Sequence, residues 1–290
     1  MKKIFFWLFL FTLLVSPKAL WAKTLNFAEF QSQMQKHIHT LSSKTKLSFH
    51  AELLGTNKIL FSHEANQYLV PASSMKLLTT IAALDALGSA ATVETRVYAE
   101  GTRVGDMLKG DLVIVGGGDP YLVSERIYLL ARDVARYGIK KISGGIKVNN
   151  QFFSAEYTKL TNWANTGEPF AALVNASSVN FNSVEVHAWV DAKTGRAMAE
   201  TGPVPHHYAI LKNNLKVITG TRSYVTISPI KMQGDREIFS VNGSVGKDAE
   251  PVIAYAAVSN SAAHLANLFA GLLRAEGMEL GSDFAGISTA

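Results

Sequence analysis

The chain contains no cysteine among its 290 residues. It can therefore form neither a disulfide framework nor a zinc-thiolate site, and it has no thiolate nucleophile and no cysteine for lipid attachment. It also lacks an internal repeat and a low-complexity tract. With 48% hydrophobic residues, the composition is that of a globular protein large enough for more than one domain.

No apolar run is long enough for a typical membrane span. The run from Ile4 to Val15 has about 12 residues, whereas a spanning helix needs about 20. It follows two lysines and precedes a small-residue cleavage site at Ala22, as in an export signal. We expect residues 1–22 to be a signal peptide and the mature protein to be periplasmic or secreted with no stable membrane anchor; an uncleaved anchor is the alternative.

Without the expected signal peptide, the chain also lacks a large excess of positive charge. Removing Lys2, Lys3 and Lys18 lowers the basic count from 28 to 25, against 23 acidic residues. No cluster of basic residues interleaved with aromatic ones is present. The sequence therefore predicts no nucleic-acid partner.

Residue patterns divide the rest of the chain into three parts. A helix over 24–41 and a hairpin over 47–61 precede an almost entirely apolar helix from Ser73 to Leu87, which we expect to be buried. Short strands follow, interrupted by one helix over 124–137. From about Pro251 the chain is predicted to be helical, most clearly over 262–276.

A serine three residues before a lysine can pair a nucleophile with its base, because positions i and i+3 share one face of a helix. Four such pairs occur: Ser43/Lys46, Ser73/Lys76, Ser228/Lys231 and Ser244/Lys247. Three lie in polar, strand-edge or glycine-rich surroundings. Only Lys76 is the sole charge in the first turns of an apolar helix, where an unused ammonium would be costly. The alternative is a helix-capping Ser73 with a lysine that extends to water.

The segment from Pro71 to Gly88 resembles the Ser-x-x-Lys segment of D-alanyl-D-alanine carboxypeptidase/endopeptidases of the penicillin-binding protein 4 type. Three further segments, 110–122, 142–153 and 241–247, resemble the same family in the same order. The resemblance covers about residues 47–285. It implies that Ser73 is the acylated nucleophile and Lys76 its proton-transfer partner, that peptidoglycan stem peptides are the substrates, that β-lactams are covalent inhibitors, and that no metal or organic cofactor is needed.

Enzymes of this kind complete the site with a Ser-x-Asn element and a Lys-Thr-Gly strand. Ser178 to Asn180, Ser240 to Asn242 and Lys193-Thr194-Gly195 match these patterns. We interpret the Lys-Thr-Gly match as the turn of a hairpin. In members of the family, the Ser-x-Asn element and the Lys-Thr-Gly strand are both expected further along the chain than any of the matching segments found here. Ser261 is a weaker candidate, since Ala263 cannot supply the amide hydrogen bonds.

Other features have simpler interpretations. The Gly116-Gly117-Gly118 run fits no phosphate-loop pattern and favours a tight turn. His206-His207 and His37-x-His39 lack further ligands at suitable spacing and are expected at the surface. Trp163, Phe170 and Trp189 could stack on sugars, although packing is the simpler role.

The predicted fold class is α/β. Residues 23–92 and 246–290 would form an incomplete serine β-lactamase/transpeptidase-like domain, with residues 93–245 as a large, mostly β insertion. Two functions remain open at this point: a serine-type D-Ala-D-Ala carboxypeptidase, or an inactive wall-associated binding protein that lacks Ser-x-Asn and Lys-Thr-Gly.

Overall fold

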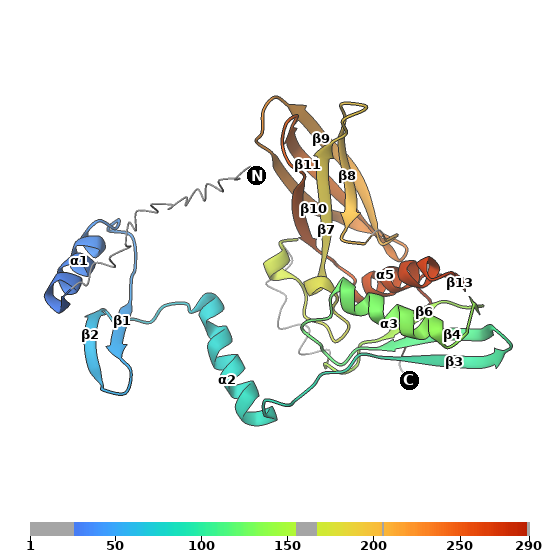
Figure 1. The fold of residues 1–290 in the computed structure, drawn as a ribbon, viewed down its shortest axis with the longest axis horizontal. Helices are drawn as coiled ribbons and strands as arrows, with labels where there is room; N and C mark the ends of the chain where they lie inside the picture. The colour runs from blue at the N-terminus through green and yellow to red at the C-terminus, as the bar shows by residue number, and fades with distance from the viewer. Residues whose placement is uncertain (1–25, 155–166, 205, 289–290) are drawn as a thin grey trace, which may run out of the picture. The chain divides into compact units, whose positions relative to one another are not determined.

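A computed structural model describes residues 26–154, 167–204 and 206–288. The expected signal peptide and Trp163 lie outside these ranges. The chain divides into two compact units, residues 1–90 and 91–290. The helices and strands of both units carry the labels of Figure 1.

The first unit begins with an amphipathic helix and a hairpin, as its sequence predicts. Asn26 caps the first helix, since its side chain accepts a hydrogen bond from the Glu29 amide at 2.8 Å. Phe61 is the buried hydrophobic residue of this unit and packs edge-on against Phe30 and Phe49. The elements are α1 (Phe27–His39), β1 (Phe49–Leu53), β2 (Lys58–His63), the 3-10 helix η1 (Ala72–Ser74) and α2 (Met75–Leu87).

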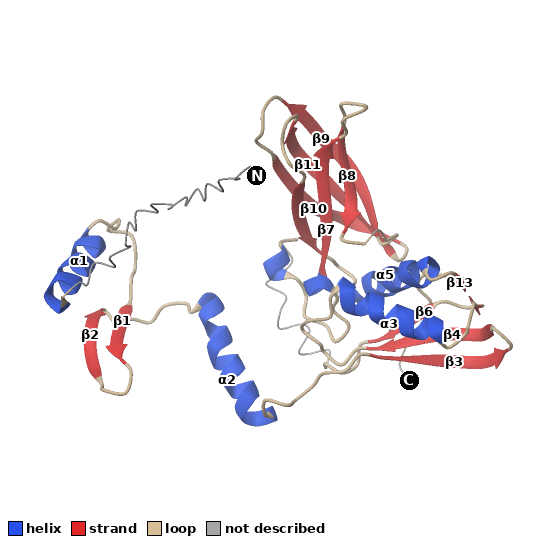
Figure 2. Ribbon diagram, viewed as in Figure 1, coloured by secondary structure: helices blue, strands red, loops and turns tan. Residues whose placement is uncertain are grey.

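The second unit contains a six-stranded sheet covered by two helices (Figure 2). The strands run in the order β13-β5-β4-β6-β14, with β3 paired to β4. One apolar core joins this sheet to the two helices and includes Ile114, Ile127 and Phe269. The elements are β3 (Arg96–Val104), β4 (Met107–Val115), α3 (Ser124–Arg136), β5 (Lys141–Ile142), β6 (Ile146–Asn149), α5 (Ser261–Ala275), β13 (Glu279–Leu280) and β14 (Gly286–Ile287).

Two three-stranded sheets share a second core in the same unit. Val184, Phe239 and Ala256 come from different strands and meet in this core, which places the two sheets face to face. In one sheet β9 lies parallel to β11, and in the other every pairing is antiparallel. The strands are β7 (Ser183–Val190), β8 (Ala197–Gly202), β9 (Ala209–Ile218), β10 (Tyr224–Gln233), β11 (Arg236–Gly246) and β12 (Val252–Ala257), and the short helices η3 (Pro169–Ala171) and η4 (Asn180–Asn182) precede them.

The structure confirms the mixed α/β class and corrects three expectations. Residues from Pro251 form strand β12 before α5 begins, because the run from Val252 to Ala257 pairs along its whole length with β7. Ser244, whose glycine-rich surroundings predict a loop, lies within β11. The third correction concerns α2, which has no buried residue in this structure.

The domain assignment stays a prediction. Residues 246–290 contribute β12, α5 and β13 to the cores of the second unit. Their grouping with residues 23–92 in one domain is the prediction made from the sequence.

Candidate active site

The Ser73/Lys76 pair lies at the junction of η1 and α2. Ser73 is the middle residue of η1, and Lys76 is the second residue of α2. The side-chain nitrogen Nζ of Lys76 donates a hydrogen bond to the Ser73 hydroxyl Oγ at 2.9 Å. The spacing of three residues therefore brings the two groups into direct contact, as the sequence predicts for this pair.

The backbone around Ser73 fixes this geometry. Ala72 has a left-handed φ of 46°, and the amide of Ser74 donates to the Pro71 carbonyl at 3.0 Å. Neither Ser73 nor Ser74 uses its side chain to cap α2. The capping alternative for Ser73 therefore finds no support, and its hydroxyl instead accepts a hydrogen bond from Lys76.

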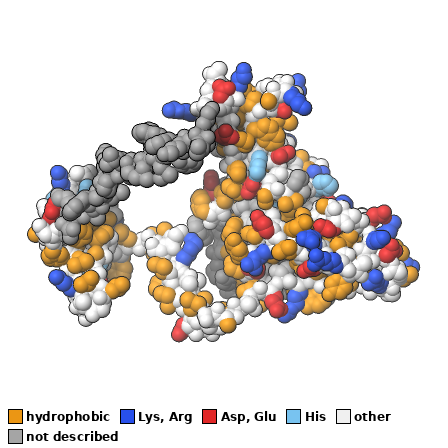
Figure 3. Space-filling model, in the orientation of Figure 1, with side chains coloured by type: hydrophobic (Ala, Val, Ile, Leu, Met, Phe, Trp, Pro, Cys, Tyr) orange, Lys and Arg blue, Asp and Glu red, His pale blue; other side chains and the backbone are white. Residues whose placement is uncertain are grey.

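Within its own unit, α2 is exposed rather than buried. Figure 3 shows hydrophobic side chains along this helix, and Leu77, Ile81 and Leu87 are each at least 63% exposed. The expectation of a buried helix was drawn from its composition alone. Burial needs covering elements as well, and in the described part of the first unit only η1 packs substantially against α2.

The three other Ser-x-x-Lys matches form no serine–lysine hydrogen bond in the parts of the chain that the structure covers. Ser43 and Lys46 lie in an exposed turn region. Ser228 and Lys231 lie on β10, where a register irregularity separates them. Ser244 and Lys247 lie at the end of β11 and just beyond it. The structure thus distinguishes Ser73/Lys76 from the other three pairs.

The candidate Ser-x-Asn elements have local structural roles. Asn180 accepts from the Ser124 amide and donates to the Ser124 hydroxyl, both at 2.9 Å, and so holds the start of α3. The Ser178 hydroxyl donates to the Asn175 carbonyl at 2.8 Å. Ser240 and Asn242 hydrogen-bond each other and Asn214 on the surface of β11 and β9.

Lys193-Thr194-Gly195 forms the turn between β7 and β8, as the hairpin interpretation predicts. The Asp191 carboxylate accepts hydrogen bonds from the Thr194 amide at 2.7 Å and from its hydroxyl at 2.6 Å. These bonds, the hydroxyl bond first, hold the pKa of Asp191 below its usual value. Gly195 takes the left-handed φ of 67° that the turn needs.

Ser261 is the first residue of α5 and is buried. The neighbouring Asn260 caps this helix by accepting from the Ala263 amide at 3.0 Å. Ser261 thus begins a helix of the second unit, and as a catalytic residue it stays a prediction together with Lys193, Thr194 and Gly195.

The glycine run after β4 serves close packing. A side chain on Gly116 would meet the Ala176 carbonyl at 2.3 Å, and one on Gly117 would meet the Glu94 carbonyl at the same distance. Gly118 has a φ of 81° and lies against the Phe153 ring. These backbone approaches explain the glycines without a bound phosphate.

The histidines divide into exposed and buried groups. His37, His39 and His207 are exposed as expected, whereas His206 is buried, and that expectation was wrong. The His206 ring packs edge-on against the His264 ring, with the ring centroids 5.3 Å apart. The described residues contain no group of three metal-ligating side chains.

Sequence reasoning missed this buried cluster, in which the Tyr208 hydroxyl donates to the Glu237 carboxylate at 2.7 Å. Burial and the Glu237 charge raise the pKa of Tyr208. Burial, followed by the charge of His206, lowers the pKa of His264 well below its usual value. No spacing signal links these residues, because β9, β11 and α5 bring them together from distant parts of the chain.

A serine hydroxyl in contact with a lysine amine, at the start of a helix, is one of the arrangements that can support acyl transfer through a serine ester. The chain matches the model of the D-Ala-D-Ala carboxypeptidase 3 (S13) family over residues 30–288. It therefore belongs to this family, which confirms the resemblance seen in its motifs.

Two relatives agree with this assignment. The chain is 31% identical over 238 residues to the D-alanyl-D-alanine carboxypeptidase of Actinomadura sp. (strain R39), covering 79% of this chain and 43% of the relative. It is 22% identical over 240 residues to the D-alanyl-D-alanine carboxypeptidase DacB of Haemophilus influenzae, covering 82% of this chain and 50% of that protein. The chain thus spans about half the length of these relatives.

The fold also resembles solved structures. The crystal structure of penicillin binding protein 4 (dacB) from Haemophilus influenzae matches with a TM-score of 0.63 and 22% identity, covering 91% of this chain and 55% of the other. A structure of the same protein in complex with a β-lactam matches with a TM-score of 0.58 and 21% identity.

Proposed function

We propose that the protein is a serine-type D-Ala-D-Ala carboxypeptidase/endopeptidase that acts on peptidoglycan stem peptides through an acyl-enzyme on Ser73. The observation that carries this proposal is the 2.9 Å hydrogen bond between Lys76 Nζ and Ser73 Oγ, in a chain of the S13 family. The substrate class follows from the family description.

The reaction proceeds in two steps. Ser73 Oγ attacks the carbonyl carbon between the last two D-alanines while the Lys76 amine takes the hydroxyl proton. Lys76 then passes this proton to the leaving amine, which departs as D-alanine or as the other peptide of a cross-link. Water next attacks the ester, which releases the shortened peptide and returns the proton to Ser73.

This function places the protein outside the cytoplasm, because its substrate is there. The basic and apolar residues 1–22 support export through a signal peptide. In the described part of the chain, no helix combines the length and apolar character needed to cross a membrane. We accordingly propose a periplasmic or secreted protein that β-lactams acylate covalently.

A fluorescent penicillin tests the proposal directly. We expect the full chain to carry the label, and Ser73→Ala to lose it while keeping its circular dichroism spectrum. Lys193→Ala should still be labelled, since Lys193 lies in the turn between β7 and β8. Label that persists in Ser73→Ala would show that the nucleophile is another residue.

One observation favours a second candidate, an inactive wall-associated binding protein. Every Ser-x-Asn and Lys-Thr-Gly match in the chain has a local structural role: Asn180 holds α3, Ser240 and Asn242 pair with Asn214, and Thr194 closes a turn. This candidate predicts that folded protein takes no label and releases no D-alanine from a peptide that ends in D-Ala-D-Ala. Measured release of D-alanine would exclude it.

A further inference from the structure

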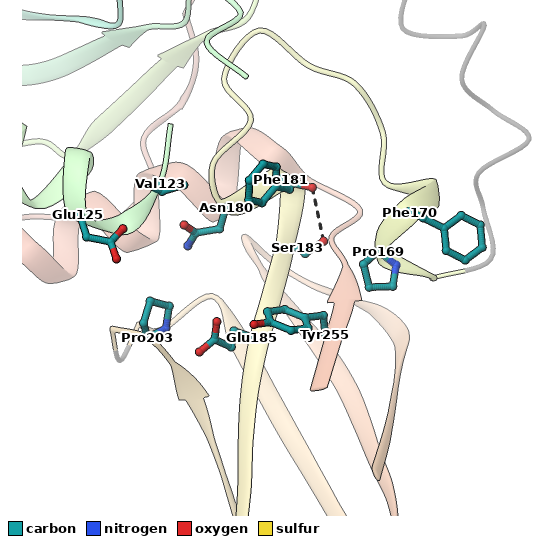
Figure 4. Close-up of a pocket in the computed structure, with 10 residues that line it drawn as sticks. All are labelled: Val123, Glu125, Pro169, Phe170, Asn180, Phe181, Ser183, Glu185, Pro203 and Tyr255. Carbon is teal, nitrogen blue, oxygen red and sulfur yellow. Dashed lines mark hydrogen bonds between the residues drawn. The ribbon is translucent and has the colours of Figure 1, made fainter. Parts of the chain in front are cut away.

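Both ends of helix α3 border a hollow on the second unit. At its start, Val123 and Glu125 line a cavity of about 490 Å³, whose other walls come largely from η3, η4, β7 and β12 (Figure 4). At its end, Val134 and Tyr137 line a second hollow of about 290 Å³. The second hollow differs from the first because strand β3, which lies at the edge of the six-stranded sheet, forms one of its walls.

This second hollow, the β3–α3 groove, has mostly apolar walls: Val97, Tyr98, Ala99, Arg103, Leu112, Val134, Tyr137 and Ile139. Arg103 is the only charged residue among the described residues that line it. Its guanidinium donates from Nε to the Gly105 carbonyl and from Nη1 to the Tyr137 carbonyl, both at 2.9 Å. Arg103 thus binds the carbonyl end of α3, where helix carbonyls lack partners, and leaves an apolar surface beside it.

The outer side of β3 is open. No other strand within residues 26–154, 167–204 and 206–288 pairs with it, and every residue of β3 except Val97 is exposed. Edge strands usually carry lysine, proline or a bulge that prevents further pairing. Strand β3 contains neither lysine nor proline, and its register with β4 has no shift from Arg96 to Val104. The edge can therefore accept another strand.

The hydrogen bonds of β4 show which backbone groups of β3 face outward. The Leu112 amide donates to the Gly145 carbonyl at 2.9 Å, so Leu112 faces away from β3. Its partner across the β3–β4 pair is Ala99. Opposite residues in an antiparallel pair exchange both hydrogen bonds or neither, so the N–H and C=O of Ala99 point to the outer side. By alternation, those of Val97 and Gly101 do the same.

The charges along this edge are complementary to those of a second β3 strand. Arg96 and Glu100 lie two residues before and two residues after Tyr98. In an antiparallel pair with Tyr98 opposite Tyr98 of a second copy, Arg96 lies opposite Glu100, and Val97 lies opposite Ala99. Two ion pairs then flank one aromatic pair, and both kinds of contact stabilise strand pairing.

Other registers with the same outward groups lack these contacts. Centring the pair on Glu100 places two glutamates opposite each other, and centring it on Val97 places Glu94 opposite Glu100. Centring it on Ala99 gives no ion pair. The charge pattern therefore favours a second copy of this chain in the one register that is centred on Tyr98.

Both charged groups are available for these contacts. Arg96 forms an ion pair with Glu94 through side chains that are 62% and 58% exposed, and an exposed pair of this kind can be exchanged at little cost. Glu100 accepts a hydrogen bond from Lys147 at 2.5 Å, while its side chain stays 46% exposed. Lys147 thus orients Glu100 without covering it.

We propose that β3 pairs in antiparallel orientation with β3 of a second copy of this chain, so that one sheet continues through both copies. Val97 of the second copy lies beside Ala99 on the α3 side of the sheet and covers the β3–α3 groove, next to Tyr137, which is 74% exposed in the single chain. The dimer pairs the outward backbone groups of both strands and buries both grooves. It does not depend on the proposed function.

Sedimentation velocity of the full chain tests for this dimer. A short strand pairing with two small grooves forms a small interface, so we expect a dissociation constant on the order of 10 µM. The weight-average mass should rise from that of one chain toward that of two when the protein concentration is increased about a hundredfold across this value.

Ala99→Pro blocks the edge, because it removes an outward N–H and places a ring there. It should weaken dimerisation at least about tenfold. The hydrogen bonds between β3 and β4 do not use this N–H, so the circular dichroism spectrum should be unchanged. Arg196→Glu, in the exposed turn between β7 and β8, is a control that should dimerise like the wild-type protein.

A mixing experiment tests the register. Arg96→Glu and Glu100→Arg each place like charges opposite one another, so each variant alone should dimerise about tenfold more weakly than the wild-type protein. In an equal mixture they should form a heterodimer with close to the wild-type affinity, because both charge pairs are again of opposite sign. Arg196→Glu mixed with Glu100→Arg should show no such recovery.

A chain that stays monomeric across the whole concentration range would overturn the proposal. If this monomer bound a synthetic peptide of residues 93–104, the edge would be a site for extended segments of other proteins instead. A dimer that persists in Ala99→Pro would use a different surface and would also refute the pairing, as would a mixture of the two charge variants that stays as weakly associated as each one alone.

Discussion

At the scale of single residues, the contact between Ser73 and Lys76 makes a direct kinetic prediction. Lys76→Met removes the group that takes the serine proton, so the rate of acylation by a fluorescent penicillin should fall by about 10²–10⁴-fold. A time course of labelling, quenched at successive times, measures this rate for the full chain.

Lys231→Met is the control for that experiment, because Lys231 belongs to another Ser-x-x-Lys match but lies on β10 without a hydrogen bond to Ser228. It should label at the wild-type rate. A Lys76→Met protein that also labels at this rate would remove Lys76 from the proposed mechanism.

The buried pair of His206 and His264 makes a prediction about stability against pH. Burial, and then the charge of His207, lowers the pKa of His206 from 6.5 to about 4. The folded state therefore binds fewer protons than the unfolded state, so stability is complete above about pH 6.5 and falls as the pH decreases toward 4.

His206 alone should reduce the free energy of unfolding by about 2 kcal/mol between pH 7.5 and pH 5. Urea unfolding followed by circular dichroism at the two pH values measures this difference. His264→Leu should make the free energy of unfolding depend less strongly on pH, because His264 also has a lowered pKa. His37→Gln, on the exposed face of α1, should leave that pH dependence unchanged. If the pH dependence of unfolding is unchanged in His264→Leu, the buried histidines are not its cause.

At the scale of elements, the sequence predicts those whose apolar period is clear. The alternation from Ser183 to Val190 gives β7, with buried and partly buried side chains in near-alternation. The helix expected over 124–137 is α3, and the one over 262–276 is α5, each within about two residues of the prediction. In these segments the local pattern and the tertiary packing agree.

The sequence does not predict the elements whose packing depends on partners far away in the chain. Strand β9 carries Lys212, Asn213 and Asn214 in its middle and shows no alternation, yet β11 pairs with all of it in parallel. Strand β12 lies where the sequence predicts the start of a helical region, because its extended form depends on pairing with β7. The Ser73/Lys76 contact could be predicted because it is local, whereas the buried contact between Tyr208 and Glu237 could not, because the two residues are far apart in the chain.

The turn between β7 and β8 gives an element-scale prediction. Asp191→Ala removes the carboxylate that accepts both Thr194 hydrogen bonds, so its Tm should be lower than that of the wild-type protein, by at most about 2–4 °C. Because the pKa of Asp191 is lowered in the fold, the wild-type advantage should disappear as the pH falls below about 4.

Differential scanning calorimetry measures this change, with Asp248→Ala at another exposed position as the control. Penicillin labelling should stay at the wild-type level in Asp191→Ala. Loss of labelling with an unchanged Tm would indicate that Lys193-Thr194-Gly195 belongs to the catalytic site after all.

At the scale of the whole molecule, the two units differ in how much they bury. The second unit contains two apolar cores, whereas Phe61, at 8% exposure, is the only buried hydrophobic residue in the described part of the first. Amides of α2 should therefore exchange with solvent at least about a hundredfold faster than those of α5. Hydrogen–deuterium exchange with mass spectrometry compares them, and equal protection would show that α2 is covered in solution.

The exposed turn at Lys193 also has a practical use. Since the chain has no cysteine, Lys193→Cys would create its single thiol, at a loop tip where substitutions cost little stability. A fluorophore or a solid support could be attached there in one step. The attachment point would lie on the second unit, so an immobilised protein would keep Ser73, which belongs to the first unit, free of chemical modification.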